Sequence, residues 1–440
     1  MPELNISAES IEKHYEILDT IGLAGSTREE GFTRTAYSDE ETSVIEYITK
    51  MAKEVGLLTR SDDMGNLIVE TPGDFKEYVE TGSHADTVPF GGNYDGLAGI
   101  VAGLEAIIQI HHSSITIKKG LRLRVWRGEE SAAFGHASMG SRGAFGCLDL
   151  AALEAIYQGQ TLQEWMQKSG VDPLCIQKKT PALSKEEVDS ISAYIELHIE
   201  QGNVLEVQKK DIGIVGGVRG PARYLVRLTG EFDHSGATPM GSKYRKDVNL
   251  AIGHIIVSLD ELVGKCLREG MDLVQTIGVI NSNNDLNDTF VDVNKNTLTK
   301  VSGFGYFTFE VRSSGRNMYE YCRIARLLIE KKAHQLGVGC EIEELSYTSG
   351  IEELNSDIRN IVEEACNETG VSYIGMVSGA WHDAAVVAEQ KRSDGSLIPA
   401  GLIFIPCRDG NSHSPDEYAS SAQIAIGATV LATAMVKLAN

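Results

Sequence analysis

The sequence predicts an α/β fold in which a mixed sheet carries helices on both faces and a smaller α+β segment is inserted. Strand-like runs alternate with amphipathic helical stretches, with no repeat between them. A chain of 440 residues exceeds one ordinary core and favours two domains. From Asp211 onward the composition shifts towards glycine and β-branched residues. We therefore expect a discontinuous larger domain at residues 1–211 and 331–440, and an inserted domain at residues 212–330.

The elements of the larger domain follow from local patterns in chain order. Helical periodicity predicts helices at 41–55 and 96–112. Short runs rich in apolar and β-branched residues predict buried strands. These runs are NLIVE at 66–70, YVETGS at 78–83, LRLRVW at 121–126 and GLIFIP at 401–406. Open parallel sheets place their sites at the carboxyl ends of strands, so the residues that follow these runs are candidates for function.

The expected insertion begins with the strand-like segment after Asp211. The patterns then predict a helix near 246–266, strands near 274–280 and 304–312, and a helix at 318–336. The sheet of the larger domain is expected to resume near Cys340.

Composition excludes several classes of partner. A net charge of -22 would repel phosphate backbones and anionic lipids, so we expect neither a nucleic-acid nor a membrane partner. The N-terminus lacks the basic and apolar regions of a secretory signal, and the longest apolar stretch, residues 424–436, is too short to span a bilayer. The seven cysteines are scattered singly, which is typical of a reduced cytoplasmic protein. Small polar substrates fit these properties better.

Five potential metal ligands fall on the predicted strand ends and turns. They are His84 in GSHADTV, Asp95 in GGNYDGLAG, Glu130 in WRGEES, His198 in IELHIEQG and His413 in NSHSPDE. Imidazole nitrogen and carboxylate oxygen bind borderline divalent ions, and a carboxylate between nitrogen ligands, here Asp95, can bridge two of them. A single histidine is more often an ordinary core or surface group. Five such contexts rarely arise together by chance.

Two further carboxylates suggest catalysis at that site. Asp86 lies two residues beyond His84, where it could accept the other imidazole N–H and fix the tautomer. Adjacent Glu129 and Glu130 leave a strand on opposite sides, so one can bind metal while the other acts as a general base. Taken alone, such a pair is usually a solvated surface. A water between two ions would be acidified to a pKa of about 7.

With these motifs, the chain resembles the amidase, hydantoinase and carbamoylase branch of the M20 metallopeptidase superfamily. The likeness extends from TRTAYS at 33–38 through the motifs above, and through DHSGATPM and SGAWHDA, to SHSPDE. It implies a dinuclear metallohydrolase domain with two divalent ions per subunit, zinc first and manganese, cobalt or nickel as alternatives. The implied roles are metal ligation by His84, Asp95, Glu130, His198 and His413, with Asp95 bridging, Glu129 as general base and Asp86 orienting His84. It also implies a homodimer in which the inserted domain acts as a lid and completes the partner's active site.

The resemblance also implies substrate contacts. Gln201 and His382 would lie at the site, His234 would stabilise a developing oxyanion in the partner subunit, and Arg312 would grip a substrate carboxylate. A turn-capping histidine and a plain surface arginine are the simpler interpretations of the last two. Thr299 or Lys300 stands near a position where the branch usually has a substrate-binding asparagine.

Other departures concern the pocket. Trp381 replaces the usual glycine of SGAGHDA, QKRSDGS is an apparent insertion before the last strand, and SAAFGHASMGSRG follows the glutamate pair. These changes leave the metal ligands intact but alter the walls.

The resemblance implies hydrolysis of the carbamoyl C–N bond of an N-carbamoyl amino acid or related ureide that carries a carboxylate. A deacylase or dipeptidase would keep the five ligands and differ only in the pocket. A serine or cysteine hydrolase is not supported, because the sequence has no GxSxG elbow and Cys147 and Cys407 lack a local catalytic signature. A non-catalytic binding protein would be expected to lack Glu129 or Asp95, and both are present.

Overall fold

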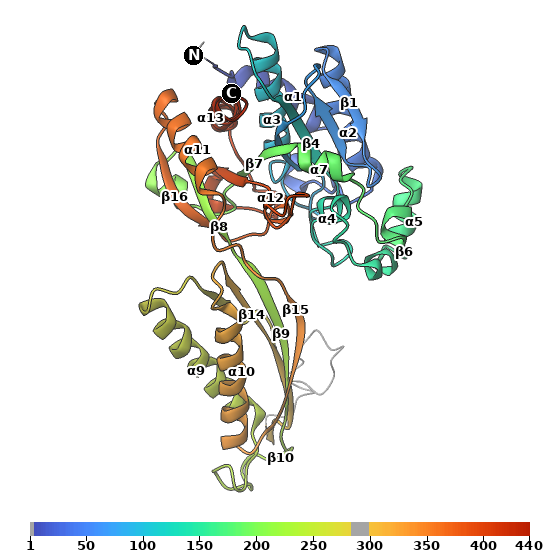
Figure 1. Cartoon of the computed structure of the whole chain (residues 1–440). Coiled ribbons are helices and arrows are strands. Elements are labelled where there is room, and N and C mark those ends of the chain that lie inside the picture. Colours follow the sequence, from blue (N-terminus) through green and yellow to red (C-terminus); the bar gives the residue numbers. More distant parts are fainter. Residues whose placement is uncertain (1–3, 283–298) are drawn as a thin grey trace. The chain divides into compact units, whose positions relative to one another are not determined.

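A computed structural model describes residues 4–282 and 299–440 of the chain (Figure 1). The chain divides into two compact units. The larger comprises Met1–Gly216 and Glu353–Asn440, and the smaller comprises Gly217–Glu352. The predicted α/β class with a large mixed sheet is confirmed.

The larger unit is built on an eight-stranded sheet in the order β1-β2-β4-β3-β7-β17-β8-β16. Its strands are β1 (Leu58–Ser61), β2 (Leu67–Glu70), β3 (Tyr78–His84), β4 (Gly120–Trp126), β7 (Ile191–Ile199), β8 (Ile212–Val218), β16 (Tyr373–Ser378) and β17 (Ala400–Ile405). The central strands β4, β3, β7 and β17 are mutually parallel, whereas β1, β2 and β8 join by antiparallel pairing. Four chain segments therefore leave the sheet at one edge.

The two faces of this sheet differ in chemistry because side chains alternate along each strand. On β7, Ile195, Leu197 and Ile199 belong to an apolar core. That core is covered by α1 (Ala8–Leu18), α2 (Asp39–Glu54), α3 (Leu97–His112), α11 (Ser356–Thr369) and α13 (Ser421–Leu438). The intervening Glu196 and His198 face the other side, where the short α12 (Asp383–Ala388) lies and its Ala384 N–H donates to Glu196 Oε2 at 2.7 Å. The polar face is the one that carries the candidate site.

The helix α13 is the one helix among the described residues with the length and apolar composition needed to cross a membrane. In this structure it is a core helix, since 61% of its 18-residue apolar window is buried and it packs on α3, α11 and β17. A capping box at Ser420 and Gln423 fixes its start.

Shorter elements complete the larger unit. They are η1 (Arg28–Glu30), α4 (Met139–Ala144), η2 (Leu150–Glu154), β5 (Ile156–Tyr157), β6 (Gln160–Thr161), α5 (Leu162–Lys168), α6 (Leu174–Gln177), α7 (Lys185–Ser190), α8 (Val204–Gln208) and η3 (Arg408–Gly410).

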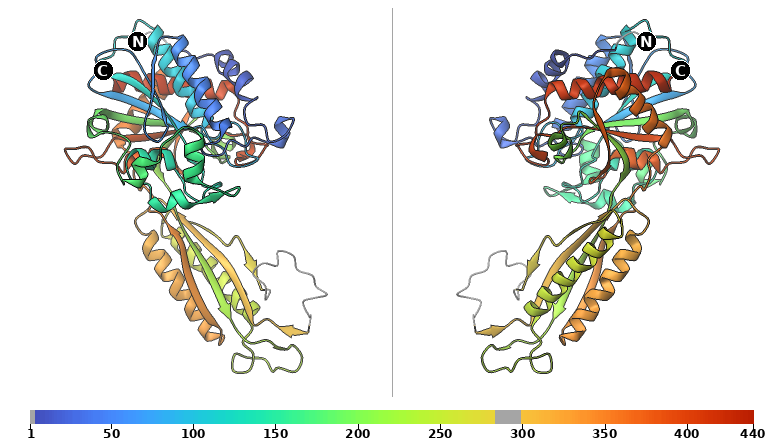
Figure 2. Two further views of the ribbon diagram at one scale, coloured as in Figure 1. Left: turned by 90° about the vertical axis from the view of Figure 1, so that its right-hand side faces the viewer. Right: turned by 90° about the vertical axis from the view of Figure 1, so that its left-hand side faces the viewer.

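The smaller unit has a second sheet with two helices on one face (Figure 2). Its strands are β9 (Gly220–Thr229), β11 (Val274–Thr276), β12 (Ile280–Asn281), β14 (Phe304–Ser313) and β15 (Gly339–Tyr347), and its helices are α9 (Val248–Arg268) and α10 (Met318–Gln335). Alternate residues of β9 and β14 are buried with both helices in a separate core. The strands β10 (Asp233–His234) and β13 (Lys300–Val301) form a small ribbon.

The boundaries of the insertion differ from those predicted. β8 belongs to the large sheet, so the first boundary is at residue 217 and not at 212. β15 pairs with β9, so the second boundary follows residue 352 and not 330, and the prediction that the large sheet resumes near Cys340 is wrong. The strand predicted at 274–280 is divided between β11 and β12. Strand composition alone does not identify the sheet that a strand joins.

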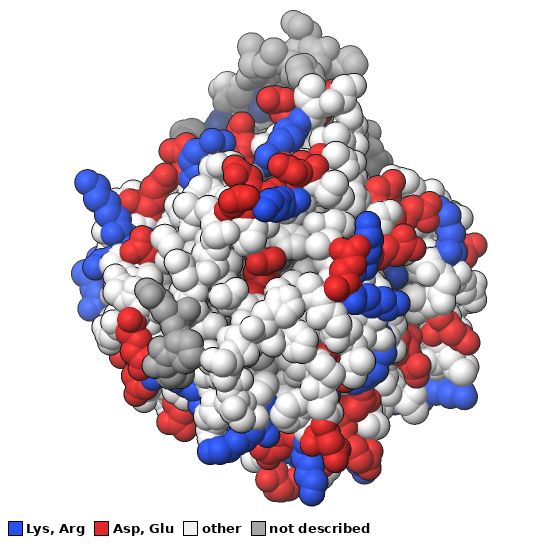
Figure 3. Space-filling view, turned by 90° about the horizontal axis from the view of Figure 1, so that it is seen from above, with Lys and Arg blue, Asp and Glu red and all other residues white. Residues whose placement is uncertain are grey.

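Acidic and basic side chains are interspersed on the face shown in Figure 3. Ion pairs join some charged side chains of the larger unit, for example Lys437 with Glu364 and Glu368. The net charge of -22 arises from the excess of 62 acidic over 40 basic residues in the whole chain.

A buried ionic group on the polar face of the sheet gives a stability prediction. Glu80 Oε1 accepts from Arg122 Nη1 at 2.5 Å, and Glu80 Oε2 accepts from Arg124 Nε at 2.5 Å. We expect Glu80→Gln to lower the free energy of unfolding by about 3–5 kcal/mol, because it leaves buried guanidinium charge uncompensated. Urea denaturation at neutral pH measures this loss, and an unchanged midpoint would contradict it.

The same group has a defined pH dependence. Burial raises the pKa of Glu80, but Arg124 and Arg122 more than offset this and place it below the usual value of 4.5. A folded-state pKa below the unfolded one contributes stability above pH 4.5, which is lost as pH falls through the folded value.

Candidate active site

The site is assembled where the four parallel strands end. His84 is the last residue of β3, and His198 is the next to last of β7. Glu129 and Glu130 follow the end of β4, and His413 lies in the loop after β17. Because these strands are parallel, their carboxyl ends bring residues that are distant in sequence to one edge.

Asp95, just before α3, stands between the other four candidate ligands. Its Oδ1 lies 3.2 Å from His84 Nε2 and 3.0 Å from His198 Nε2. Its Oδ2 lies 3.4 Å from His413 Nε2, which is in turn 3.2 Å from Glu130 Oε1. The five residues therefore form two groups that could each hold a metal ion, and the two groups share Asp95.

Two other groupings of ligand atoms occur around the same residues. One joins His84 with Glu129 and Glu130, and the other joins His198 with Glu196 and His382. The second is less suited to a metal because Glu196 already accepts from Ser83 Oγ at 2.8 Å and from a backbone N–H.

Gly96, between Asp95 and α3, permits the close approach of this turn to the histidines. Its φ is +68°, and a Cβ there would lie 2.4 Å from His84 O and 2.5 Å from the His84 ring. Its N–H points to His198 Nε2 at 3.2 Å. Any side chain at this position would push the turn away from both histidines.

Asp86 holds the turn that carries Glu129 and Glu130, called here the glutamate turn, and it also contacts His84. Its Oδ1 and Oδ2 accept the backbone N–H groups of Glu129 and Glu130 at 2.9 and 3.0 Å. His84 Nδ1 is 3.1 Å from the backbone oxygen of Asp86 and 3.4 Å from its Oδ1. Both contacts suit a proton on Nδ1. Nε2, which faces Asp95, then has a free lone pair, and this is the tautomer that a metal ligand requires.

Glu129 and Glu130 have different partners although they are adjacent. Glu130 faces His413, whereas Glu129 Oε1 accepts from Ser138 Oγ at 3.1 Å. Burial raises the pKa of Glu129 well above its usual value. A nearby cation would lower that pKa again, which suits a group that must gain and release a proton.

The electrostatics of the cluster favour a bound cation. Burial works against ionisation of Asp95, but the facing histidines, His198 foremost, hold its pKa well below the usual value. Hydrogen bonds to Asp95 and Glu130 raise the pKa of His413 to about 11. The negative field that holds protons on these nitrogens also attracts a metal ion.

The two predicted contacts beside the ligands lie at the cluster. Gln201 Nε2 donates to Asp95 Oδ2 at 2.7 Å, while its Oε1 is buried without a hydrogen-bond partner. The His382 ring centre is 4.5 Å from that of His198, and its Nε2 lies 2.9 Å from Ser378 Oγ. Gln201 therefore retains an amide oxygen available to a ligand.

Three residues of the cluster and its surroundings have a left-handed backbone. Ser138, Gln201 and His413 have φ values of +54°, +57° and +56°, a region that non-glycine residues seldom occupy. Such conformations persist where the surrounding structure enforces them, often at functional sites.

The remaining predicted residues belong to the smaller unit. His234 Nδ1 accepts the backbone N–H groups of Gly236 and Ala237, both at 3.1 Å, which is the turn-capping contact. Arg312 Nε donates to Glu310 Oε1 at 2.8 Å. Thr299 is exposed, and its backbone oxygen accepts from Ser235 N at 2.7 Å. Their roles in catalysis stay predictions.

Several residues around the site were not predicted from the sequence. They are the buried Ser138, Glu196 and Glu417 and the half-buried Ser412. Three of them lie inside motifs that were already recognised, since Glu196 is in IELHIEQG, and Ser412 and Glu417 are in SHSPDE. The positions of these residues in the motifs indicated that they lie near the site, but did not identify the groups to which they bond.

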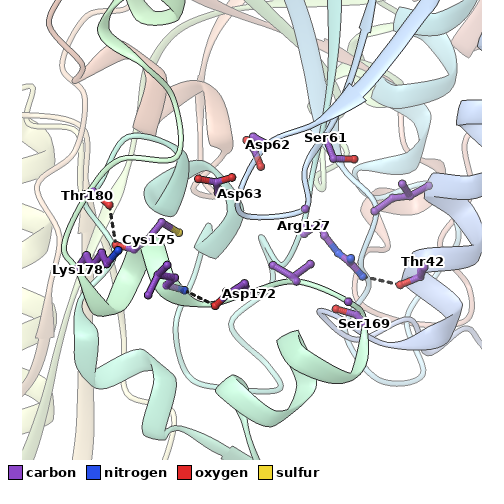
Figure 4. Close-up of a pocket in the computed structure, with 15 residues that line it drawn as sticks. Thr42, Ser61, Asp62, Asp63, Arg127, Ser169, Asp172, Cys175, Lys178 and Thr180 are labelled. Atoms are coloured by element: carbon purple, nitrogen blue, oxygen red, sulfur yellow. Dashed lines mark hydrogen bonds between the residues drawn. The ribbon is translucent and has the colours of Figure 1, made fainter.

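A separate cavity of about 560 Å³ lies beside α2 and α6 (Figure 4). The predicted site residues are not among the described residues that line it. Its Arg127 donates to Glu41 Oε2 at 2.6 Å and Thr42 Oγ1 at 2.7 Å, and its Asp62 accepts bonds within its own turn. These polar groups are engaged by the chain itself, and the cavity receives no functional assignment.

The fold and this donor set are together typical of a two-metal hydrolase. The family described as peptidase family M20/M25/M40 matches residues 81–437, and the chain belongs to it. The resemblance found in the sequence is thereby confirmed.

Two relatives of nearly equal length are amidohydrolases by name. Allantoate amidohydrolase of Bacillus subtilis (strain 168) is 32% identical over 430 residues, which cover 96% of this chain and 97% of that protein. N-carbamoyl-L-amino-acid amidohydrolase of Pseudomonas sp. (strain NS671) is 29% identical over 446 residues, which cover 99% and 100%. Among solved structures, an amidase of the hydantoinase/carbamoylase family from Burkholderia multivorans matches with a TM-score of 0.84 and 27% identity, over 100% of this chain and 99% of that one.

Proposed function

We propose that the protein is a metal-dependent amidohydrolase that cleaves the carbamoyl C–N bond of an N-carbamoyl amino acid or a related ureide. The observation that carries the proposal is Asp95, whose two oxygens face separate groups of nitrogen and oxygen ligands. The full-length likeness to N-carbamoyl-L-amino-acid and allantoate amidohydrolases supports the reaction class.

The donor set fits two divalent ions. His84, Asp95 and His198 would hold one, and Asp95, Glu130 and His413 the other. Mixed nitrogen and oxygen donors suit zinc first, with manganese, cobalt or nickel as alternatives. Such ions supply Lewis-acid chemistry, which polarises a carbonyl group and lowers the pKa of a water molecule to about 7.

Residues of the chain then move the proton. Glu129 accepts a proton from the attacking water and passes it to the departing nitrogen. Ser138, which donates to Glu129 Oε1, keeps that carboxylate oriented. Asp86 holds the backbone of the glutamate turn, so Glu129 and Glu130 keep separate tasks.

Substrate binding would use residues of both units. Arg312 would pair with the substrate carboxylate, in competition with its present partner Glu310. His234 accepts backbone N–H groups at Nδ1, so its neutral ring carries the proton on Nε2, where it can donate to an oxyanion. Gln201, His382 and Thr299 are the further proposed contacts.

We also infer a homodimer in which the smaller unit acts as a lid that completes the active site of the partner. A cytoplasmic location is inferred from the cysteines, since all seven, which fall within the described ranges, are free thiols. An N-acyl amino acid deacylase or a dipeptidase is the second candidate function, because relatives within one fold can share a metal centre and differ in the pocket.

The substrate class is tested with purified protein reconstituted with zinc or manganese. The panel contains N-carbamoyl-L-amino acids, N-carbamoyl-β-alanine, allantoate and N-acyl amino acids, with ammonia and free amine measured separately. For a carbamoyl amino acid we expect amine and ammonia in equal amounts, carbon dioxide as the third product, and loss of both signals with chelator.

The products discriminate between the two candidates, whereas the chelator tests the metal dependence that both share. Free amine without ammonia would favour the deacylase or dipeptidase. Turnover that resists a chelator would contradict the metal-dependent mechanism.

A further inference from the structure

We propose that Glu417 is a positioning residue that braces Asp95 and His413 together and is needed for binding of the second metal ion. The inference rests on the proposed function in requiring a metal at Asp95, but not on any particular substrate. Nothing in the sequence pattern alone assigns this residue a partner.

One carboxylate joins the two loops that carry these ligands. Glu417 Oε1 accepts the backbone N–H groups of Tyr94 and Asp95, each at 2.9 Å. Glu417 Oε2 accepts the backbone N–H of His413 at 3.3 Å. Asp95 and Glu417 are 322 positions apart in sequence, so this residue ties a loop of the N-terminal half to the last loop of the larger unit.

Ser412 adds a second connection between the same groups. Its Oγ lies 3.0 Å from Asp95 Oδ2 and 3.3 Å from Glu417 Oε2. The single hydroxyl proton can serve the nearer oxygen, which is the Asp95 oxygen on the His413 side. Glu417 thus accepts a hydrogen bond from the backbone of Asp95, whereas Ser412 donates one to the Asp95 side chain.

Packing prevents Glu417 from leaving this position. Its exposed fraction is 3%, and Gly92 lies so close that a Cβ on Gly92 would be 2.3 Å from Glu417 Cβ. The carboxylate is therefore held against the Asp95 loop. The backbone N–H groups of Tyr94, Asp95 and His413 depend on this buried carboxylate as their acceptor, because water cannot replace it there.

Replacement by glutamine should affect the two metal groups unequally. The amide has one acceptor oxygen, which best serves the two N–H groups of Tyr94 and Asp95. Its NH2 would then face the His413 N–H, donor against donor, and the His413 loop would move. His84 and His198 are fixed on strands β3 and β7, so the group of ligands that contains them should lose less affinity for its metal ion.

The test is to titrate metal-free protein with zinc in a calorimeter and to measure the metal content of dialysed samples. We expect wild type to bind two ions per chain. In Glu417→Gln we expect the first ion to bind as in wild type and the second to bind 10- to 100-fold more weakly, the range seen when groups that support metal ligands are removed.

Glu200→Gln is the matched control. Glu200 is also buried, with 8% exposed, and its oxygens accept the backbone N–H groups of Val204 and Leu205 at 2.8 Å each. The Glu200 carboxylate has the same kind of structural task, but it holds Val204 and Leu205 and not Asp95 or His413, so we expect this variant to bind two ions like wild type. If Glu417→Gln does not fold, as judged by circular dichroism, Glu417→Asp is titrated in its place, with weakening of the second ion expected again.

The outcomes separate this inference from the proposed function. Wild-type affinity for both ions in the Glu417 variants would overturn the inference alone, as would equal losses in Glu200→Gln. Loss of both ions to the same degree would also overturn it, because the effect would then be general. A wild-type protein that binds fewer than two ions would instead contradict the proposed metal centre.

Discussion

Glu129→Gln is expected to retain two bound metal ions and to lose about 10²–10⁴-fold in kcat, the range that general acid–base catalysis contributes. Glutamine has nearly the shape of glutamate but cannot accept a proton from water at neutral pH. The metal groups around Asp95 do not require Glu129, since Glu130 is the glutamate that faces His413. The measurements are steady-state kinetics on the best substrate of the panel and metal content of the same sample.

The neighbouring glutamate supplies a matched comparison. Glu130→Gln removes a proposed ligand, so it should lose much of the second ion and lose activity with it. Normal turnover by Glu129→Gln would remove the general-base assignment. If that variant lost metal instead, the alternative group of His84, Glu129 and Glu130 would be the better description of the ligands.

The cluster of candidate metal ligands could be predicted because its members lie in short motifs at the ends of strands. His84 and His198 end strands that are parallel neighbours, and parallel strands present their carboxyl ends at one edge. The position of Asp95 between both groups was expected from ligand chemistry and from the family resemblance. Local motifs, sheet geometry and that resemblance were needed together for these residues.

Other features depended on contacts that local sequence does not encode. β15 was assigned to the wrong sheet because an exposed strand with irregular alternation can add to either one. Glu417 could be read only as part of a motif, because its role depends on Tyr94 and Asp95 in a distant segment. For His234, the sequence left two interpretations open. The structure shows that His234 Nδ1 caps the turn. The proposed catalytic role therefore requires Nε2 to be the nitrogen that donates to the oxyanion.

Asp95→Asn is expected to abolish turnover, down to the level of chelator-treated wild type, and to reduce the bound metal to at most one ion per chain. Two neighbouring cations repel each other, and the carboxylate charge of Asp95 is the one that both groups share. An amide supplies a single neutral oxygen, which can face His84 and His198 or His413, but not both sides. Metal analysis and the product assays measure the two effects on one preparation.

Asp149→Asn is the control for the same chemical change elsewhere. Asp149 Oδ1 accepts the backbone N–H of Ala151 at 2.9 Å at the start of η2, and asparagine serves equally well as a helix N-cap. That variant should keep two ions and full turnover. Two tightly bound ions in Asp95→Asn would refute the bridging role of Asp95, and substantial turnover with one ion would show that a single metal group suffices for the reaction.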